Sequence, residues 1–108
     1  MPALKFKAIE SEKVCAISRD LVDELQEIVK CPRDYFILEV VQSTFIKDGE
    51  FVKGYPVVEI SWFNRGQEIQ DKVAKAVTKY VHSMGYHDVD VIFIALKENE
   101  YYENGEHF

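Results

Sequence analysis

Pro2 is the residue whose position most clearly suggests chemistry, because it directly follows Met1. A small second residue usually lets the initiator methionine be removed, which would leave Pro2 with a free secondary amine. A free α-amino group has a pKa of roughly 8, and burial beside cationic groups disfavours its charged form. The neutral amine could move a proton next to a carbonyl group, as in keto–enol tautomerisation, or form an iminium with a carbonyl compound. Alternatively, Pro2 is an ordinary second residue without a chemical role.

Arg65 is a candidate for binding an anionic group. It stands at the turn before the second expected helix. A guanidinium there can hold a carboxylate through two parallel hydrogen bonds, and the amino end of the helix adds partial positive charge. A solvated turn arginine is an equally good interpretation of this residue.

The sequence argues against several other kinds of site. Cys15 and Cys31 are too few and too isolated for a disulfide scaffold, a CxxC redox pair or a zinc site. Cys31 is expected to be a small structural residue, since no histidine is near it in sequence. The histidines show no metal-ligand spacing, and no phosphate loop, nucleotide fingerprint or catalytic triad signature is present. We therefore expect no metal and no cofactor.

Composition indicates one globular domain in the cytoplasm. The chain has 108 residues, of which 47% are hydrophobic and 30% are charged. Its net charge of -6 argues against a nucleic-acid or anionic-membrane partner, because both require a basic surface. The apolar runs are shorter than a membrane span, and the start of the chain does not resemble a signal peptide.

The first half of the chain predicts a strand, a helix and a second strand. Residues 3–9 alternate apolar and polar side chains, which is the period of a half-buried strand. Ser11 is expected to cap a helix whose apolar stripe recurs every three or four residues. Pro32 cannot continue that helix, and residues 35–45 return to side chains that favour strands.

The second half repeats this pattern after the turn signals in residues 47–54. Residues 57–63 predict a third strand. Asn64 and Gln67 have the spacing of a capping box at the start of a second helix. Residues 89–96 predict the fourth strand. The resulting order is βαββαβ, an α+β class built from two similar halves.

Two sheets have this order of elements. One is a ferredoxin-like split βαβ sandwich. The other makes each half a parallel βαβ unit, with both helices on one face of a four-stranded mixed sheet. The second and third strands are largely apolar on both faces, whereas two helices can cover only one. Apolar surface left in water forfeits about 25 cal/mol per Å². We therefore expect other copies of the chain to cover the second face.

Four charged residues are expected on that second face: Lys5, Lys7, Glu39 and Glu59. Such charges must pair, because an unpaired buried charge is expensive. Ion pairs inside an oligomer are therefore favoured over a catalytic pair of carboxylates.

A proline leading into a strand, two βαβ halves and a sheet face that needs cover together resemble the tautomerase superfamily, which includes macrophage migration inhibitory factor and 5-carboxymethyl-2-hydroxymuconate isomerase. CPRDYFILEVV, residues 31–41, is similar to the start of the second strand in the migration-factor branch. FNRGQEIQDKVAKAV, residues 63–77, is similar to the isomerase-branch segment where an arginine precedes the second helix. LKFKAIE, the WFNR turn and YYENGEHF most resemble a small, uncharacterised bacterial family with this fold.

This resemblance implies a single tautomerase-like domain over residues 1–108, with halves at about 2–46 and 55–97 and a tail at 98–108. It also implies a homotrimer in which edge strands pair between subunits. Pro2 would then lie at the floor of a pocket between subunits.

The resemblance further implies that the tail reaches a neighbouring subunit, so that Tyr101 and Tyr102 line or cap this pocket. Aromatic rings with hydroxyl tips suit a wet interface equally well. His107, near the end of the same tail, is expected to be solvated.

The resemblance also assigns residues that bind substrate. Arg65 matches the arginine that the family carries before its second helix. The migration-factor lysine falls on Cys31, where the flanking Lys30 and Arg33 would substitute for it. Many members carry an arginine at the start of the first helix, but residues 9–13 here read IESEK, which argues against the usual acidic substrates.

Three functions follow as hypotheses. The first is a tautomerase or isomerase that uses Pro2 as acid and base on a small carbonyl compound. The second is a non-catalytic oligomer that binds a metabolite or a protein through the same pocket. The third is a ferredoxin-like regulatory domain.

Overall fold

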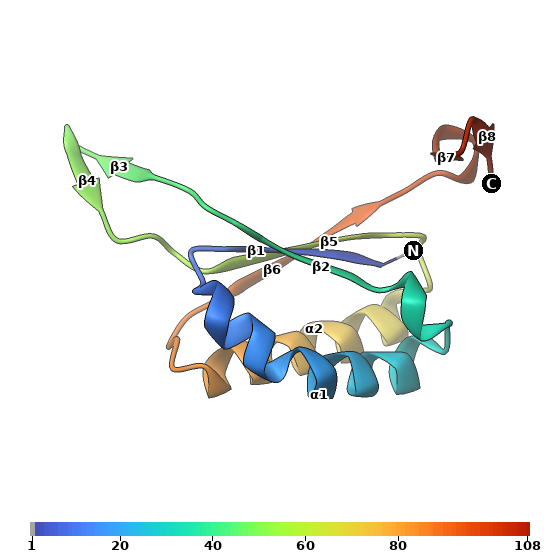
Figure 1. The fold of residues 1–108 in the computed structure, drawn as a ribbon, viewed down its shortest axis with the longest axis horizontal. Coiled ribbons are helices and arrows are strands. Elements are labelled where there is room, and N and C mark those ends of the chain that lie inside the picture. Colours follow the sequence, from blue (N-terminus) through green and yellow to red (C-terminus); the bar gives the residue numbers. More distant parts are fainter. Residues whose placement is uncertain (1) are drawn as a thin grey trace.

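The computed structural model describes residues 2–108 and has two layers (Figure 1). The helices α1 (Ser11–Val29) and α2 (Gln67–Ser83) lie side by side on one face of a sheet. The sheet consists of β1 (Ala3–Lys7), β2 (Ile37–Val41), β5 (Val57–Trp62) and β6 (Asp90–Ala95). Neither helix in this described part is long and apolar enough to cross a membrane.

Shorter elements complete the chain. Two-stranded ribbons are formed by β3 (Phe45–Lys47) with β4 (Glu50–Val52), and by β7 (Tyr102–Glu103) with β8 (Glu106–His107). Single turns of 3₁₀ helix lie at η1 (Arg33–Tyr35) and η2 (Glu98–Glu100).

The strand order is β2-β1-β5-β6, with β1 parallel to β2, β5 parallel to β6, and β1 antiparallel to β5. Each half is therefore a parallel βαβ unit whose two strands pair directly. This confirms the expected mixed sheet with both helices on one face. A split βαβ arrangement places another strand between the parallel pair, so the ferredoxin-like alternative is wrong.

The two units are related by an approximate twofold axis. Lys5 lies opposite Glu59 at the centre of the β1–β5 pair. On either side of this central pair, two residues of β1 lie opposite two residues of β5. The start of each central strand therefore lies beside the end of the other. As a result, the beginnings of β1 and β5 are at opposite ends of the sheet.

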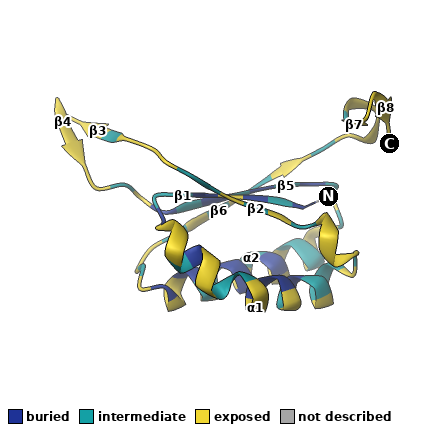
Figure 2. Cartoon of the chain, in the orientation of Figure 1, coloured by how far each residue is buried: buried dark blue, intermediate teal, exposed yellow. Residues whose placement is uncertain are grey.

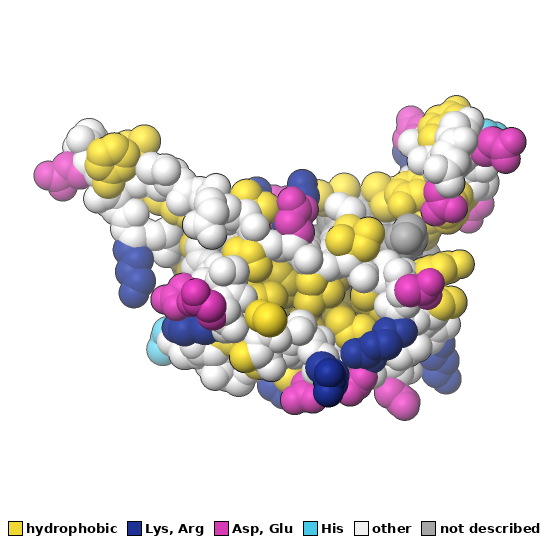
Figure 3. Space-filling view, in the orientation of Figure 1, with side chains coloured by type: hydrophobic (Ala, Val, Ile, Leu, Met, Phe, Trp, Pro, Cys, Tyr) yellow, Lys and Arg dark blue, Asp and Glu magenta, His cyan; other side chains and the backbone are white. Residues whose placement is uncertain are grey.

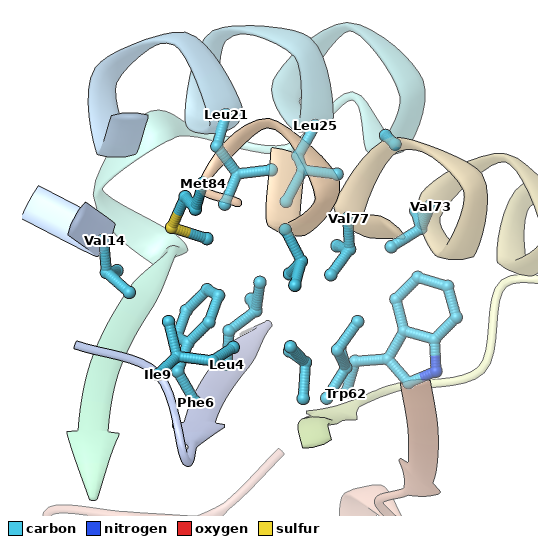
Figure 4. Packing of buried hydrophobic residues seen from close by; sticks show 14 residues of the cluster. Leu4, Phe6, Ile9, Val14, Leu21, Leu25, Trp62, Val73, Val77 and Met84 are labelled. Atoms are coloured by element: carbon cyan, nitrogen blue, oxygen red, sulfur yellow. The ribbon is translucent and has the colours of Figure 1, made fainter. Parts of the chain in front are cut away.

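The core lies between the sheet and the helices, where side chains from both layers interdigitate (Figure 4). Alternate residues of the central strands point toward the helices, as the period of a strand requires. Leu4 and Phe6 of β1 and Trp62 of β5 are fully buried against helix residues that include Leu21 and Leu25. The alternation expected from the sequence is thereby confirmed.

Both helices begin differently from the sequence expectation. Glu10, rather than Ser11, is the residue before α1, and it makes no capping bond with its side chain. Helix α2 follows Gly66, which also provides no side-chain cap. The side-chain oxygen of Asn64 instead accepts the Gly66 N–H at 2.8 Å. An asparagine that bonds the backbone two residues ahead closes a turn, so the expected capping box does not form.

The expected strand over residues 35–45 is interrupted. Its first residue belongs to η1, β2 ends at Val41, and β3 begins at Phe45. The segment 47–54, expected only as a turn, contributes to a β3–β4 hairpin.

Both hairpins are closed by residues that tolerate a left-handed backbone. Asp48 and Gly49 have φ of 51° and 77°, and Asn104 and Gly105 have φ of 54° and 88°. Two consecutive positive φ values match the right-handed twist of hairpin strands. We call residues 45–52 the first arm and residues 102–107 the second arm.

The arms extend from opposite ends of the sheet, on the side that the helices leave open (Figure 1). Their tips are exposed (Figure 2). The open face and the two arms together form a concave surface of the subunit.

Replacing Leu25 with alanine tests the assignment of the core. Leu25 is 1% exposed, and its truncation should lower the free energy of unfolding by about 2–5 kcal/mol because a cavity remains. Glu27→Ala, at an exposed position two residues further along α1, should change it by no more than about 0.5 kcal/mol. Urea denaturation at one fixed protein concentration measures both. Equal effects of the two substitutions would contradict this packing.

Candidate functional site

Pro2 lies at the end of the sheet where β1 begins, and its side chain is less than 2% exposed. Its carbonyl oxygen accepts a hydrogen bond from the N–H of Ile37, at the start of β2, at 3.0 Å. On the other side, Ala3 pairs with Ser61, so Pro2 lies beside the Trp62 end of β5. The backbone of Pro2 is therefore held between two neighbouring strands.

Arg65 lies at the same end of β5. Its guanidinium carbon is 5.5 Å from the centroid of the Trp62 ring, within the range of a cation–π contact. Its Nη1 donates a hydrogen bond to the Phe63 carbonyl oxygen at 2.9 Å. The structure therefore brings a half-buried cation to the end of the sheet that holds Pro2.

An aromatic cluster joins the second arm to this end of the sheet. Tyr101 lies edge-on to Phe63, with ring centroids 5.4 Å apart, and Phe108 stacks on Phe63 at 5.6 Å. Tyr101 and Phe108 also contact each other, at 4.9 Å, and the Phe108 N–H donates to the Tyr101 carbonyl oxygen at 3.1 Å. The tail thus folds back on the residue whose carbonyl group holds Arg65.

Tyr102 takes no part in this cluster. Its ring is 61% exposed and packs edge-on against the His107 ring, at 5.8 Å. Of the two tyrosines expected at the site, only Tyr101 packs against Phe63.

Lys30 and Arg33 lie at the end of α1, in the helix layer. Lys30 ends the helix in a left-handed conformation, with φ of 59°. The Arg33 guanidinium pairs with the Asp23 carboxylate and also donates to the Arg19 carbonyl oxygen. These contacts tie the Arg33 guanidinium to α1. The half-buried Cys31 accepts a hydrogen bond through its carbonyl oxygen from the Gln26 side chain.

The four charged residues expected on the second face do share it. In the strand register Lys5 lies opposite Glu39 on one side and opposite Glu59 on the other, and Lys7 Nζ lies 2.8 Å from Glu59 Oε1. The residues around them on the same face are apolar and open to solvent, with exposed fractions of 48%, 46% and 43% for Ile37, Ile92 and Ile94. Figure 3 shows acidic, basic and apolar side chains gathered between the two arms.

The sequence reasoning missed a counterpart of Pro2 in the second half. Pro56 immediately precedes β5, is buried, and accepts the Asp90 N–H at the start of β6 at 3.1 Å, as Pro2 does from Ile37. Its nitrogen is part of a peptide bond, so it has no free amine. Comparing MPALKF with YPVVEI would have revealed the repeat.

Comparison with known proteins agrees with this architecture. Residues 1–107 match DUF1904, a domain of unknown function. The crystal structure of a DUF1904 domain from Sebaldella termitidis is 39% identical over 100% of both chains, with a TM-score of 0.93. No protein with a curated description matches the chain.

More distant structures share the fold. The macrophage migration inhibitory factor-like protein of Entamoeba histolytica is 18% identical, with a TM-score of 0.75 over 99% of this chain and 98% of that one. The asymmetric trimer of wild-type F6 fused 4-OT is 9% identical, with a TM-score of 0.83 over 97% and 94%. The tautomerase-like fold expected from the sequence is thus confirmed.

Removing the Tyr101 ring tests how the second arm is held. Tyr101→Ala loses the ring contacts with Phe63 and Phe108, each worth about 0.5–1.5 kcal/mol, so amide hydrogen exchange at Phe108 should accelerate roughly tenfold. Tyr102→Ala is the matched control, because its ring is outside the cluster, and it should leave exchange at Phe108 nearly unchanged. Equal acceleration by both variants would mean that the cluster does not anchor the arm.

Proposed function

Because the chain belongs to the DUF1904 family, whose function is unknown, we propose from the site itself that it is a tautomerase or isomerase of small carbonyl compounds. The amine of Pro2, freed by removal of Met1, is the general acid and base. The observation that carries this proposal is the buried position of Pro2 at the same end of β5 as the Arg65 guanidinium.

The proposed chemistry follows from that position. Burial and a nearby guanidinium both disfavour the charged form of an amine, so the Pro2 nitrogen is expected to be neutral at physiological pH. The neutral nitrogen accepts the proton from the carbon next to the carbonyl group, and the resulting ammonium returns a proton to the enolate oxygen. The bonding electrons shift within the substrate, and no oxidant or reductant is needed.

Arg65 and the aromatic cluster supply binding. The guanidinium holds an anionic group of the substrate, and the cluster of Phe63, Tyr101 and Phe108 packs against its apolar part. Glu10 follows the far end of β1, so within one subunit it is remote from Pro2. The acidic segment IESEK therefore does not oppose an anionic substrate from within the same subunit. Lys30 and Arg33 lie in the segment that leads to Ile37 at the Pro2 end of the sheet, but the Arg33 guanidinium is paired with Asp23, so we propose for both only a secondary part in binding.

We further propose a homotrimer as the working form. The open sheet face carries exposed isoleucines, and the first arm carries Ile46 and Phe51 at 67% and 82% exposure. Large apolar side chains left in water are unfavourable, and a closed ring of copies would cover them. The fused 4-OT of the same fold is a trimer, which supports this assembly by likeness of fold alone.

The role of Pro2 is tested by Pro2→Ala. With phenylpyruvate as a keto–enol test substrate, kcat/KM should fall about 100-fold or more, since a positioned acid–base group contributes about 10²–10⁴-fold. Pro32→Ala, at an exposed proline, should retain the wild-type rate. Full turnover by Pro2→Ala would remove the proposal.

The state of the amino terminus provides an independent test. Mass spectrometry of the purified protein should give the mass of a chain that starts at Pro2. A retained Met1 would block the amine and favour the alternative function, a non-catalytic binding module that uses the same pocket.

The proposed assembly is tested on the open face. Ile92 lies opposite Glu59 in the sheet, so Ile92→Asp places two carboxylates together on the surface to be covered. Light scattering should show a trimer for the wild type and a smaller species for Ile92→Asp. Lys75→Asp, at an exposed position of α2, should remain trimeric. A monomeric wild type would contradict the assembly.

A further inference from the structure

A hollow lies at the opposite end of the sheet from Pro2. It has a volume of 580 Å³ and is formed by the start of β5 at Pro56, the base of the first arm, and residues 85–88 between α2 and β6. Under the approximate twofold axis, these elements correspond to the start of β1, the base of the second arm and the segment between α1 and β2. The hollow is therefore the structural counterpart of the Pro2 site.

Its walls combine aromatic side chains with polar ones. Phe45 and Phe51 of the first arm face the hollow together with Tyr55 and Tyr86. A concave volume of several hundred Å³ in which aromatic side chains lie beside polar groups is suited to a small molecule.

One wall is firmly packed. A Cβ atom at Gly54 would lie 2.5 Å from the Phe45 ring and 2.8 Å from the Ala8 Cβ, distances that ordinary contacts do not reach. The base of the first arm thus lies directly against the end of β1, where only glycine fits. Close packing of this kind leaves the wall little freedom to collapse inward.

Asp88 and Lys53 balance each other in the lining itself, and carboxylates outnumber ammonium groups once the adjoining residues are included. Asp88 lines the hollow, and Asp90 accepts a hydrogen bond from the Tyr55 hydroxyl at 3.2 Å. Glu10 and Glu12 line an adjoining hollow that shares Ala8, Ser43, Lys53 and Tyr86 with it. The pKa of Tyr55 is raised. The largest cause is partial desolvation, and smaller causes are the hydrogen bond and charge of Asp90 and the charge of Asp88. Two ammonium groups oppose these carboxylates: Lys53 lines the hollow, and Lys13 lies over the Tyr86 ring. His87 also lines the hollow.

A cation already lies over one of these rings. Lys13 Nζ is 4.8 Å from the centroid of the Tyr86 ring, and the Tyr86 hydroxyl oxygen accepts the Glu10 N–H at 2.9 Å. Aromatic faces near carboxylates attract cations through the negative face of the ring. An anionic ligand would instead meet the excess of carboxylates.

We propose that this hollow is a second binding site, which takes a small organic cation that carries an aromatic ring. It binds without acid–base chemistry of the Pro2 type, because the Pro56 nitrogen is a peptide nitrogen. The two ends of the sheet thus differ in both role and preferred charge. The proposal does not depend on catalysis at Pro2.

The proposal is tested by NMR titration of the full-length protein with two probes of similar size and opposite charge, phenethylamine and phenylacetate. Phenethylamine should shift the signals of Tyr55, Tyr86 and residues 85–88, and should bind about fivefold more tightly there than phenylacetate, since partly exposed charge pairs contribute up to about 1 kcal/mol. Asp88→Asn should weaken phenethylamine binding about threefold. Asp34→Asn, in the corresponding segment of the first half, should leave it unchanged.

Four results would overturn the proposal: equal or tighter binding of phenylacetate, shifts centred on Arg65, equal effects of the two asparagine variants, or the absence of shifts because another copy of the chain fills the hollow. Pro2→Ala separates this site from the proposed activity. It should lower kcat/KM about 100-fold or more but leave phenethylamine binding at Tyr55 and Tyr86 unchanged.

Discussion

The antiparallel pairing of β1 with β5 is the constraint on which the other features depend. It joins the two βαβ units, and Lys5 opposite Glu59 defines its register. This register lays the start of β1 beside the end of β5, which brings Pro2 to the Trp62 end of that strand, where Arg65 also lies. By the same geometry it places Pro56 at the end of β1. A slip of one residue would turn Leu4 and Phe6 away from the helices, so the buried core and the two sites depend on the same register.

The placement of both helices on one face has a second consequence. The opposite face keeps a charged row between isoleucines, and the two arms rise on either side of it. In one subunit the Lys7–Glu59 pair is partly exposed, with side-chain accessibilities of 34% and 24%, and contributes little there. If the face is covered, the same charges must stay paired, because a buried charge without its partner is costly. A row of charges that must find partners can then favour one arrangement of neighbouring copies over others.

Much of the fold was predictable because its signals are local. Strand alternation identified the buried face of the central strands, and the apolar stripes identified both helices. The strand order was harder to predict, since the alternation of apolar and polar residues along a strand says nothing about which strands become neighbours. The resemblance to the tautomerase superfamily favoured one of the two possible sheets, and the structure decides between them.

The errors in the sequence interpretation have physical causes. Asn64 and Ser11 are good capping residues, but Asn64 bonds inside a turn and Ser11 is already within the helix. The first arm was interpreted as part of a strand and a turn, because hairpins of three-residue strands have almost no periodicity. Of the candidate site residues, Arg65 and Tyr101 lie toward the Pro2 end because short connections follow β5 and β6. The contacts of Arg33 with α1 required knowledge of the packing between α1 and η1.

The protonation of the Pro2 nitrogen is the property on which the proposed chemistry rests. The most direct measurement is a ¹⁵N NMR titration of protein labelled at proline. We predict that the Pro2 nitrogen titrates as an amine with a pKa below the value of about 8 for an ordinary amino terminus, because burial and the nearby guanidinium disfavour its charged form. A nitrogen that does not titrate, because Met1 is still attached, or one with a pKa at or above about 8, would contradict a role for Pro2 as the catalytic base.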